Sequence, residues 1–138
     1  MKRFHLIFGI AVVVIFLLTG QYMEYVHNRL LPDGTRVLYR SRHIYILLAG
    51  LLNLIIGTYF IPRQRGWRRT IQIIGSVLIV LAPGFLLVGF FYEPRRGPEH
   101  TMVAPLGIFA LALGTLLHAL SGLRRKGNRQ ETGQHVEL

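Results

Sequence analysis

Two histidines at the edges of apolar stretches are the side chains in this chain best suited to chemistry. His5 begins the first apolar stretch, and His118 lies about one helical turn from the end of the last. Neutral imidazoles on two helices can bind a haem iron from its two axial sides. His5 and His118 therefore define one alternative, a haem b or redox-linked membrane bundle. We prefer the other interpretation, in which His5 is interfacial and His118 is a hydrogen-bonded packing residue.

Two further groups of polar residues are weaker candidates for binding sites. The segment Arg40-Ser41-Arg42 is densely basic, and arginine offers paired hydrogen bonds to phosphate or carboxylate. It predicts an anion site for a lipid phosphate or for the acidic loop of a partner. Three histidines stand near Glu24, Glu93 and Glu99, and they are weak candidates for a metal site that lacks any H-E-x-x-H signature: His27, His43 and His100.

The sequence offers no pattern typical of an enzyme. A Ser/His/Asp arrangement, a phosphate-binding glycine loop and paired carboxylates cannot be assembled from it with useful specificity. The chain has no cysteine, which excludes thiolate-bound zinc and iron–sulfur clusters. We therefore predict no catalytic residues, no enzymatic activity and no resident cofactor apart from the haem alternative.

Four long apolar stretches must position these side chains. They cover residues 4–23, 44–61, 70–92 and 101–123, without a single Asp, Glu, Lys or Arg. At ~1.5 Å of rise per residue, each is long enough to cross a hydrocarbon layer of ~30 Å. We predict an all-α membrane protein, an up-down bundle of four transmembrane helices in residues 1–123. The first stretch is expected to be a retained signal anchor, and residues 124–138 a basic, disordered cytoplasmic tail.

The distribution of Lys and Arg predicts the orientation. Ten of them lie on the side of both termini and six on the other side, which favours cytoplasmic termini by the positive-inside rule. The arginine-rich loops are typical of a plasma membrane, and we expect the bacterial inner membrane. The formal charge of +10 predicts contact with anionic lipids. A nucleic-acid partner is not expected, because the basic residues are divided among short segments.

The first outer loop is expected over about residues 24–43. Within it, Leu31-Pro32-Asp33-Gly34-Thr35 has the composition of a turn. It predicts a short hairpin or a loop lying on the membrane surface, and the alternative is an irregular solvated connection.

Small and polar residues within the spans predict how the helices pack. Asn53 falls in the middle of its span, where an unpaired amide is costly, so it should bond to a neighbouring helix. Pro83 cannot donate to the Ile79 carbonyl, which makes that oxygen a suitable acceptor. Small residues that let helix backbones approach closely recur in the second and fourth spans at a shared G-x6-G spacing: Gly50, Gly57, Gly107 and Gly114.

These features predict a small polytopic membrane protein that is an accessory, scaffold or lipid-interacting component. It would work with a membrane-protein partner or as a homo-oligomer. An up-down bundle is expected to place the first and last helices side by side, which would bring His5 near His118. The haem or redox bundle and an oligomeric passive transporter of a small solute remain as alternatives.

Overall fold

A computed structural model describes residues 1–27, 31–59 and 66–122 of the chain. In this part of the chain it contains four long helices and one short 3-10 turn: α1 (Lys2–His27), α2 (Asp33–Tyr59), α3 (Trp67–Arg96), η1 (Pro98–His100) and α4 (Val103–Gly122). All four helices are long and apolar enough to cross a membrane. The predicted all-α class and the four spans are confirmed, and the predicted tail, 124–138, lies outside the described residues.

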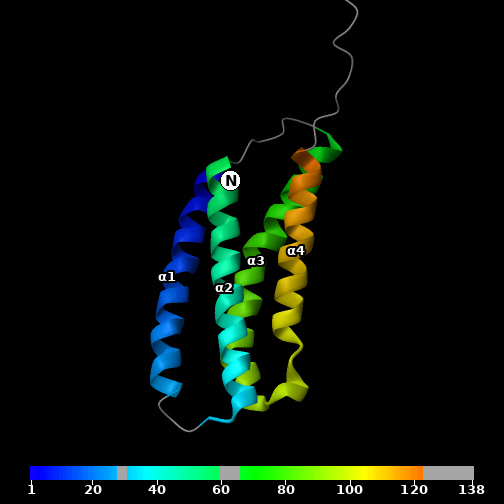
Figure 1. Ribbon diagram of the computed structural model, residues 1–138. Helices are drawn as coiled ribbons and strands as arrows, with labels where there is room; N and C mark the ends of the chain where they lie inside the picture. Colours follow the sequence, from blue (N-terminus) through cyan, green and yellow to red (C-terminus); the bar gives the residue numbers. More distant parts are fainter. Residues whose placement is uncertain (28–30, 60–65, 123–138) are drawn as a thin grey trace, which may run out of the picture.

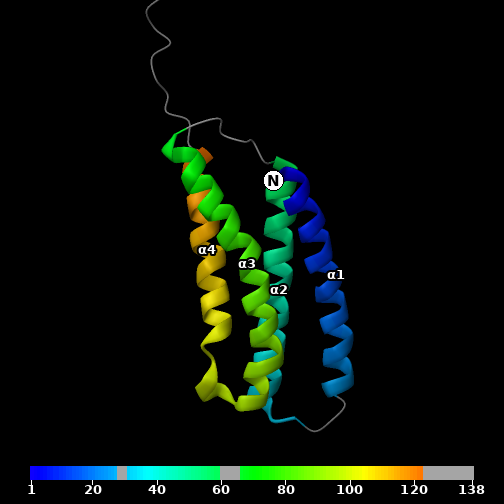
Figure 2. The same cartoon turned by 180° about the vertical axis from the view of Figure 1, so that it is seen from behind.

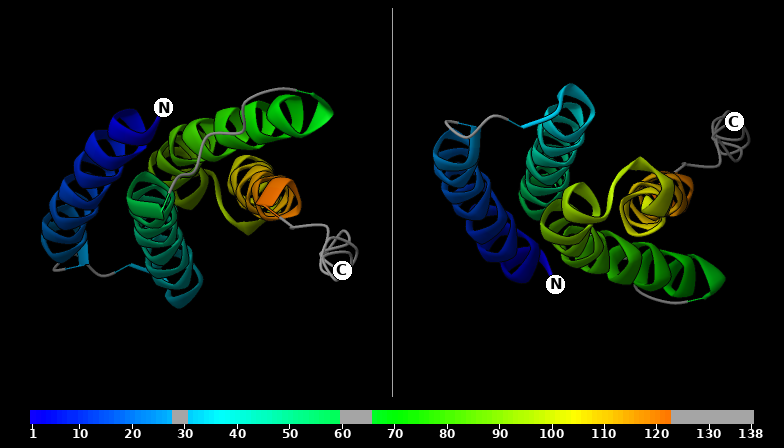
Figure 3. Two further views of the ribbon diagram at one scale, coloured as in Figure 1. Left: turned by 90° about the horizontal axis from the view of Figure 1, so that it is seen from above. Right: turned by 90° about the horizontal axis from the view of Figure 1, so that it is seen from below.

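The helices run up and down and pack in chain order (Figures 1 and 2). α1 pairs with α2 and α3 pairs with α4, and the two hairpins meet mainly where α2 contacts α3. Among the described residues α1 and α4 do not pack against each other, and the end-on views of Figure 3 place them on opposite sides of the α2–α3 pair. The prediction that the first and last helices lie side by side is therefore wrong. In a membrane, lipid would solvate the outer faces of α1 and α4 as well as protein does, so no hydrophobic gain would drive the bundle to close.

The start of α2 corrects the prediction of a long first outer loop. The helix begins at Asp33, within the predicted turn, and the Arg36 amide already donates to the Pro32 carbonyl at 3.2 Å. Proline and aspartate suit helix starts as well as turns, because the carboxylate lies favourably at the positive end of the helix. Residues 33–43 are therefore neither a hairpin nor an irregular loop.

The two central helices are longer than the apolar stretches within them. α2 has 27 residues and α3 has 30, which correspond to lengths of ~40 and ~45 Å. Their extensions at one end of the bundle carry Arg42 and Glu93, which charge counting assigns to loops and which the structure buries. We call this end the Glu93 end. The opposite end, where α1 and α3 begin, we call the His5 end.

Glycines set the close approach within each hairpin. A Cβ atom on Gly57 would lie 2.5 Å from the Leu6 backbone nitrogen, and one on Gly114 would lie 2.8 Å from the Gly75 carbonyl oxygen. Gly50 faces α1 in the same way as Gly57, and Gly107 faces α3 as Gly114 does. In both hairpins the second helix therefore turns its G-x6-G pair toward the first.

Candidate functional site

A buried asparagine joins three helices near the His5 end. Asn53 is fully buried, and its Nδ2 donates to the carbonyl oxygens of Ala49 at 2.9 Å and of Ile79 at 3.3 Å. Its Oδ1 lies 2.9 Å from Nδ1 of His5. Because an amide oxygen can only accept, His5 carries a proton on Nδ1. This Asn53 junction ties α1 and α3 to α2 through one side chain.

The predicted bond from Asn53 to the Ile79 carbonyl is thus present. Pro83 lies four residues after Ile79 and has no N–H, so the carbonyl has no helical donor from that position. The hydrogen bond with His5 was not predicted. It depends on the axial register between α1 and α2, which the sequence of either helix alone does not specify.

The structure brings the two histidines of the haem alternative near each other without giving them a common pocket. His118 is close enough to His5 for an electrostatic interaction. Gly75 of α3 packs on the α4 backbone at His118, so closely that a Cβ atom on Gly75 would lie 3.1 Å from the His118 nitrogen. A pocket of about 160 Å³ does lie beside His5, but His118 does not line it. A haem whose iron is bound by both imidazoles would need a pocket lined by both histidines.

A second junction lies at the Glu93 end and contains a buried ion pair. Glu93 is 1% exposed, and its Oε2 accepts a hydrogen bond from Arg42 Nε at 2.8 Å and lies 2.7 Å from Arg42 Nη2. Its Oε1 accepts the backbone N–H groups of Val103 and Ala104 at 2.8 and 2.9 Å. One carboxylate therefore connects α2, α3 and the first turn of α4. Its charge also lies favourably at the positive end of the α4 dipole.

The arginine of this junction is held by its own helix as well. Arg42 Nη1 donates to Ser41 Oγ at 2.8 Å, and Ser41 Oγ donates to the Leu38 carbonyl at 3.0 Å. Arg42 is therefore occupied inside the protein, which corrects its assignment to an external anion site, while Arg40 is exposed. Arg42 and Glu93 are separated by 51 residues, so no local pattern pointed to their pairing.

Aromatic rings gather at the same end of the bundle. Tyr39 packs edge-on against the fully buried Phe90, with 5.3 Å between ring centroids, and Tyr22 packs against Phe91 at 5.5 Å. Arg95 Nη2 donates to the Tyr22 hydroxyl at 3.2 Å. These rings link α1, α2 and α3 at the level where tyrosines favour a membrane interface.

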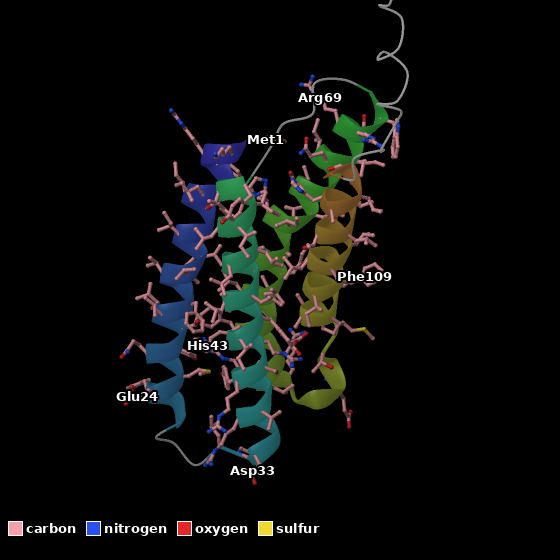
Figure 4. All side chains as sticks on the ribbon, turned by 45° about the horizontal axis from the view of Figure 1, so that its top comes forward. Met1, Glu24, Asp33, His43, Arg69 and Phe109 are labelled. Atoms are coloured by element: carbon pink, nitrogen blue, oxygen red, sulfur yellow. The ribbon has the colours of Figure 1, made fainter. Side chains whose placement is uncertain are left out.

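The two described histidine side chains of the candidate metal site do not lie in a cluster of metal ligands. His43 shares a hydrogen bond of 3.0 Å with Thr19 and stacks on Phe16, with 4.0 Å between ring centroids (Figure 4). His100 is exposed in η1, and the His27 side chain is not among those that the structure describes. Among the described residues, no three His, Asp or Glu side chains come together in a way that would hold a metal ion.

A groove between α2 and α4 is open to the surroundings of the protein. Its volume is about 440 Å³, and its lining is apolar apart from one threonine: Leu48, Leu52, Ile108, Leu111, Ala112, Thr115, Leu116 and Ala119. The hairpins meet through α2 and α3, so no further helix of the described chain covers this groove.

Comparisons with protein-family models, with curated proteins and with solved structures find no match to this chain. The four apolar helices define a small polytopic membrane protein with an up-down helical fold. At the two junctions, the side chains of Asn53, Arg42 and Glu93 connect helices of the bundle.

Proposed function

We propose that this protein is a non-enzymatic accessory or scaffold component of a membrane assembly, which binds a transmembrane helix in the groove between α2 and α4. The occupant is a helix of a partner protein or of a second copy of this chain. The observation that carries the proposal is the groove itself, whose α4 wall presents the small residues Ala112, Thr115 and Ala119.

Small residues favour this use because helices in lipid associate by close packing. Ala112, Thr115 and Ala119 follow one face of α4 at helical spacing. Gly107 and Gly114 lie on another face, which packs against α3. α4 therefore has two small-residue faces, one used inside the fold and one turned to the open groove. An acyl chain alone would not require the second face to be small.

We place the protein in a plasma membrane, the bacterial inner membrane in our proposal, with both termini in the cytoplasm. The support is the excess of Lys and Arg on the side of the termini, ten against six. Residues Lys2 and Arg3 at the start of α1 would then lie at anionic headgroups of the inner leaflet.

The chain has no cysteine, so single introduced cysteines can map the groove without a background. Ala112→Cys should give a cross-linked product in native membranes, whose mass identifies either a second copy or a partner. Leu113→Cys is the matched control at the same depth, since Leu113 is exposed and is not among the residues that line the groove. Adding Ala119→Phe should fill the groove and abolish the product. Equal cross-linking from both cysteine positions would refute a specific docking site.

The purified protein distinguishes the scaffold from the haem alternative. An absorbance spectrum should show no Soret band if the protein is a scaffold. A Soret band that disappears in His118→Ala would overturn the proposal and assign a redox role to the His5 end. Solute flux in liposomes that contain the purified protein would instead favour the passive transporter.

A further inference from the structure

We infer that the pocket beside His5 is a binding site for one anionic membrane phospholipid. The pocket, about 160 Å³ in volume, lies between the start of α1 and the middle of α3. Its lining is apolar except for His5 and Ser76: Met1, Phe4, His5, Ser76, Val77, Val80 and Leu81. The inference is independent of the groove between α2 and α4, which is lined by different residues.

Ser76 is the residue that points to a ligand. Ser76 is 2% exposed, and its Oγ atom has no hydrogen-bond partner among the described residues. A serine or threonine hydroxyl in a helix ordinarily donates to the carbonyl three or four residues earlier, as Ser121 does to His118 and Thr115 does to Leu111 in this protein. A buried hydroxyl without a partner is costly. An acceptor in the pocket would remove that cost.

The apolar walls and the position of the pocket select the kind of ligand. Val77, Val80 and Leu81 continue along α3 from Ser76 toward the middle of the bundle and form a surface suited to an acyl chain. The ester carbonyl at the head of that chain is the acceptor that Ser76 lacks. A phospholipid therefore fits with its ester at Ser76 and its chain along α3.

Positive charge at the same end favours an anionic headgroup. Lys2 and Arg3 are exposed in the first turn of α1, and His5 lies only ~4.5 Å further along the helix axis. The phosphate of a lipid lies just outside its ester groups, at the level that these two side chains can reach by extending toward the interface. Basic residues beside a pocket between transmembrane helices are a known means of holding anionic lipids.

The test is native mass spectrometry of the full, delipidated chain in mild detergent, titrated separately with phosphatidylglycerol and phosphatidylcholine. We expect one phosphatidylglycerol to bind in preference to phosphatidylcholine. Val80→Phe should fill the pocket and abolish that adduct. Val88→Phe is the matched control, the same substitution at an exposed position of α3 outside the pocket, and should bind like the unmodified chain.

Two variants with little effect on packing test the individual contacts. Ser76→Ala should weaken binding of both lipids roughly fivefold, the equivalent of one net hydrogen bond. Replacing Lys2 and Arg3 together by glutamine should remove the preference for phosphatidylglycerol and leave phosphatidylcholine binding unchanged. The inference is overturned if Val80→Phe and Val88→Phe bind lipid alike, or if Ser76→Ala binds both lipids like the unmodified chain. The latter outcome would mean that no group of the lipid accepts a hydrogen bond from the Ser76 hydroxyl.

Discussion

Replacing Glu93 by alanine should destabilise this fold more than any other single removal of a charged group among the described residues. The substitution leaves the Arg42 guanidinium buried without its carboxylate, since Arg42 is 8% exposed. It also leaves the N–H groups of Val103 and Ala104 at the start of α4 without an acceptor. Three helices lose a common connection in one step.

The expected loss in the free energy of unfolding depends on which partner groups each variant leaves unpaired. Removing one member of a buried ion pair typically costs about 3–5 kcal/mol. We expect about 5 kcal/mol for Glu93→Ala, because the first turn of α4 loses two charge-assisted hydrogen bonds as well. Arg42→Met should cost only about 3 kcal/mol, since the Glu93 carboxylate keeps the N–H donors and the positive end of α4. The double variant should cost less than the sum of both.

Reversible unfolding of the purified protein by SDS in mixed micelles, followed by circular dichroism, measures these differences. Asp33→Asn is the control, because the Asp33 carboxylate is fully exposed and lies 3.9 Å from Arg36, so its removal should cost less than about 1 kcal/mol. The reasoning would be refuted if Arg42→Met proved as damaging as Glu93→Ala. It would also be refuted if Glu93→Ala behaved like Asp33→Asn.

Two further predictions use the same unfolding assay. Asn53→Leu removes the bonds from Asn53 to His5 and to the Ile79 carbonyl, which join α2 to α1 and α3, and the bond to the Ala49 carbonyl within α2. It should cost about 1–2 kcal/mol, and an unchanged free energy of unfolding would contradict this role of Asn53. Gly57→Ala should cost about 1–3 kcal/mol, because its Cβ would lie 2.5 Å from the Leu6 nitrogen and force α1 away from α2. Gly84→Ala, whose new Cβ would meet no described atom of a neighbouring helix within 4 Å, should not destabilise the protein. Equal losses from the two glycine substitutions would contradict the assigned close approach.

The hydrogen bond between α2 and α3 shows how much of the helix packing could be predicted from the sequence. Proline chemistry makes the Ile79 carbonyl available, and the position of Asn53 in its span requires a partner, so both halves of this bond could be predicted from residue types. The third partner, His5, could not, because its contact depends on the register between α1 and α2. That register is set by the close approach at Gly57, a property of two surfaces.

The sequence by itself determined that four helices cross a membrane, because length and hydrophobicity are properties of each segment alone. It also marked Asn53 and the glycines as packing positions. Only the tertiary structure decided that α1 and α4 stand apart, that α2 begins at Asp33, and that Arg42 and Glu93 are buried together. Pairing across 51 residues leaves no local pattern in the sequence. A charged residue next to an apolar stretch also looks the same in the sequence whether its side chain faces water or pairs with another charge.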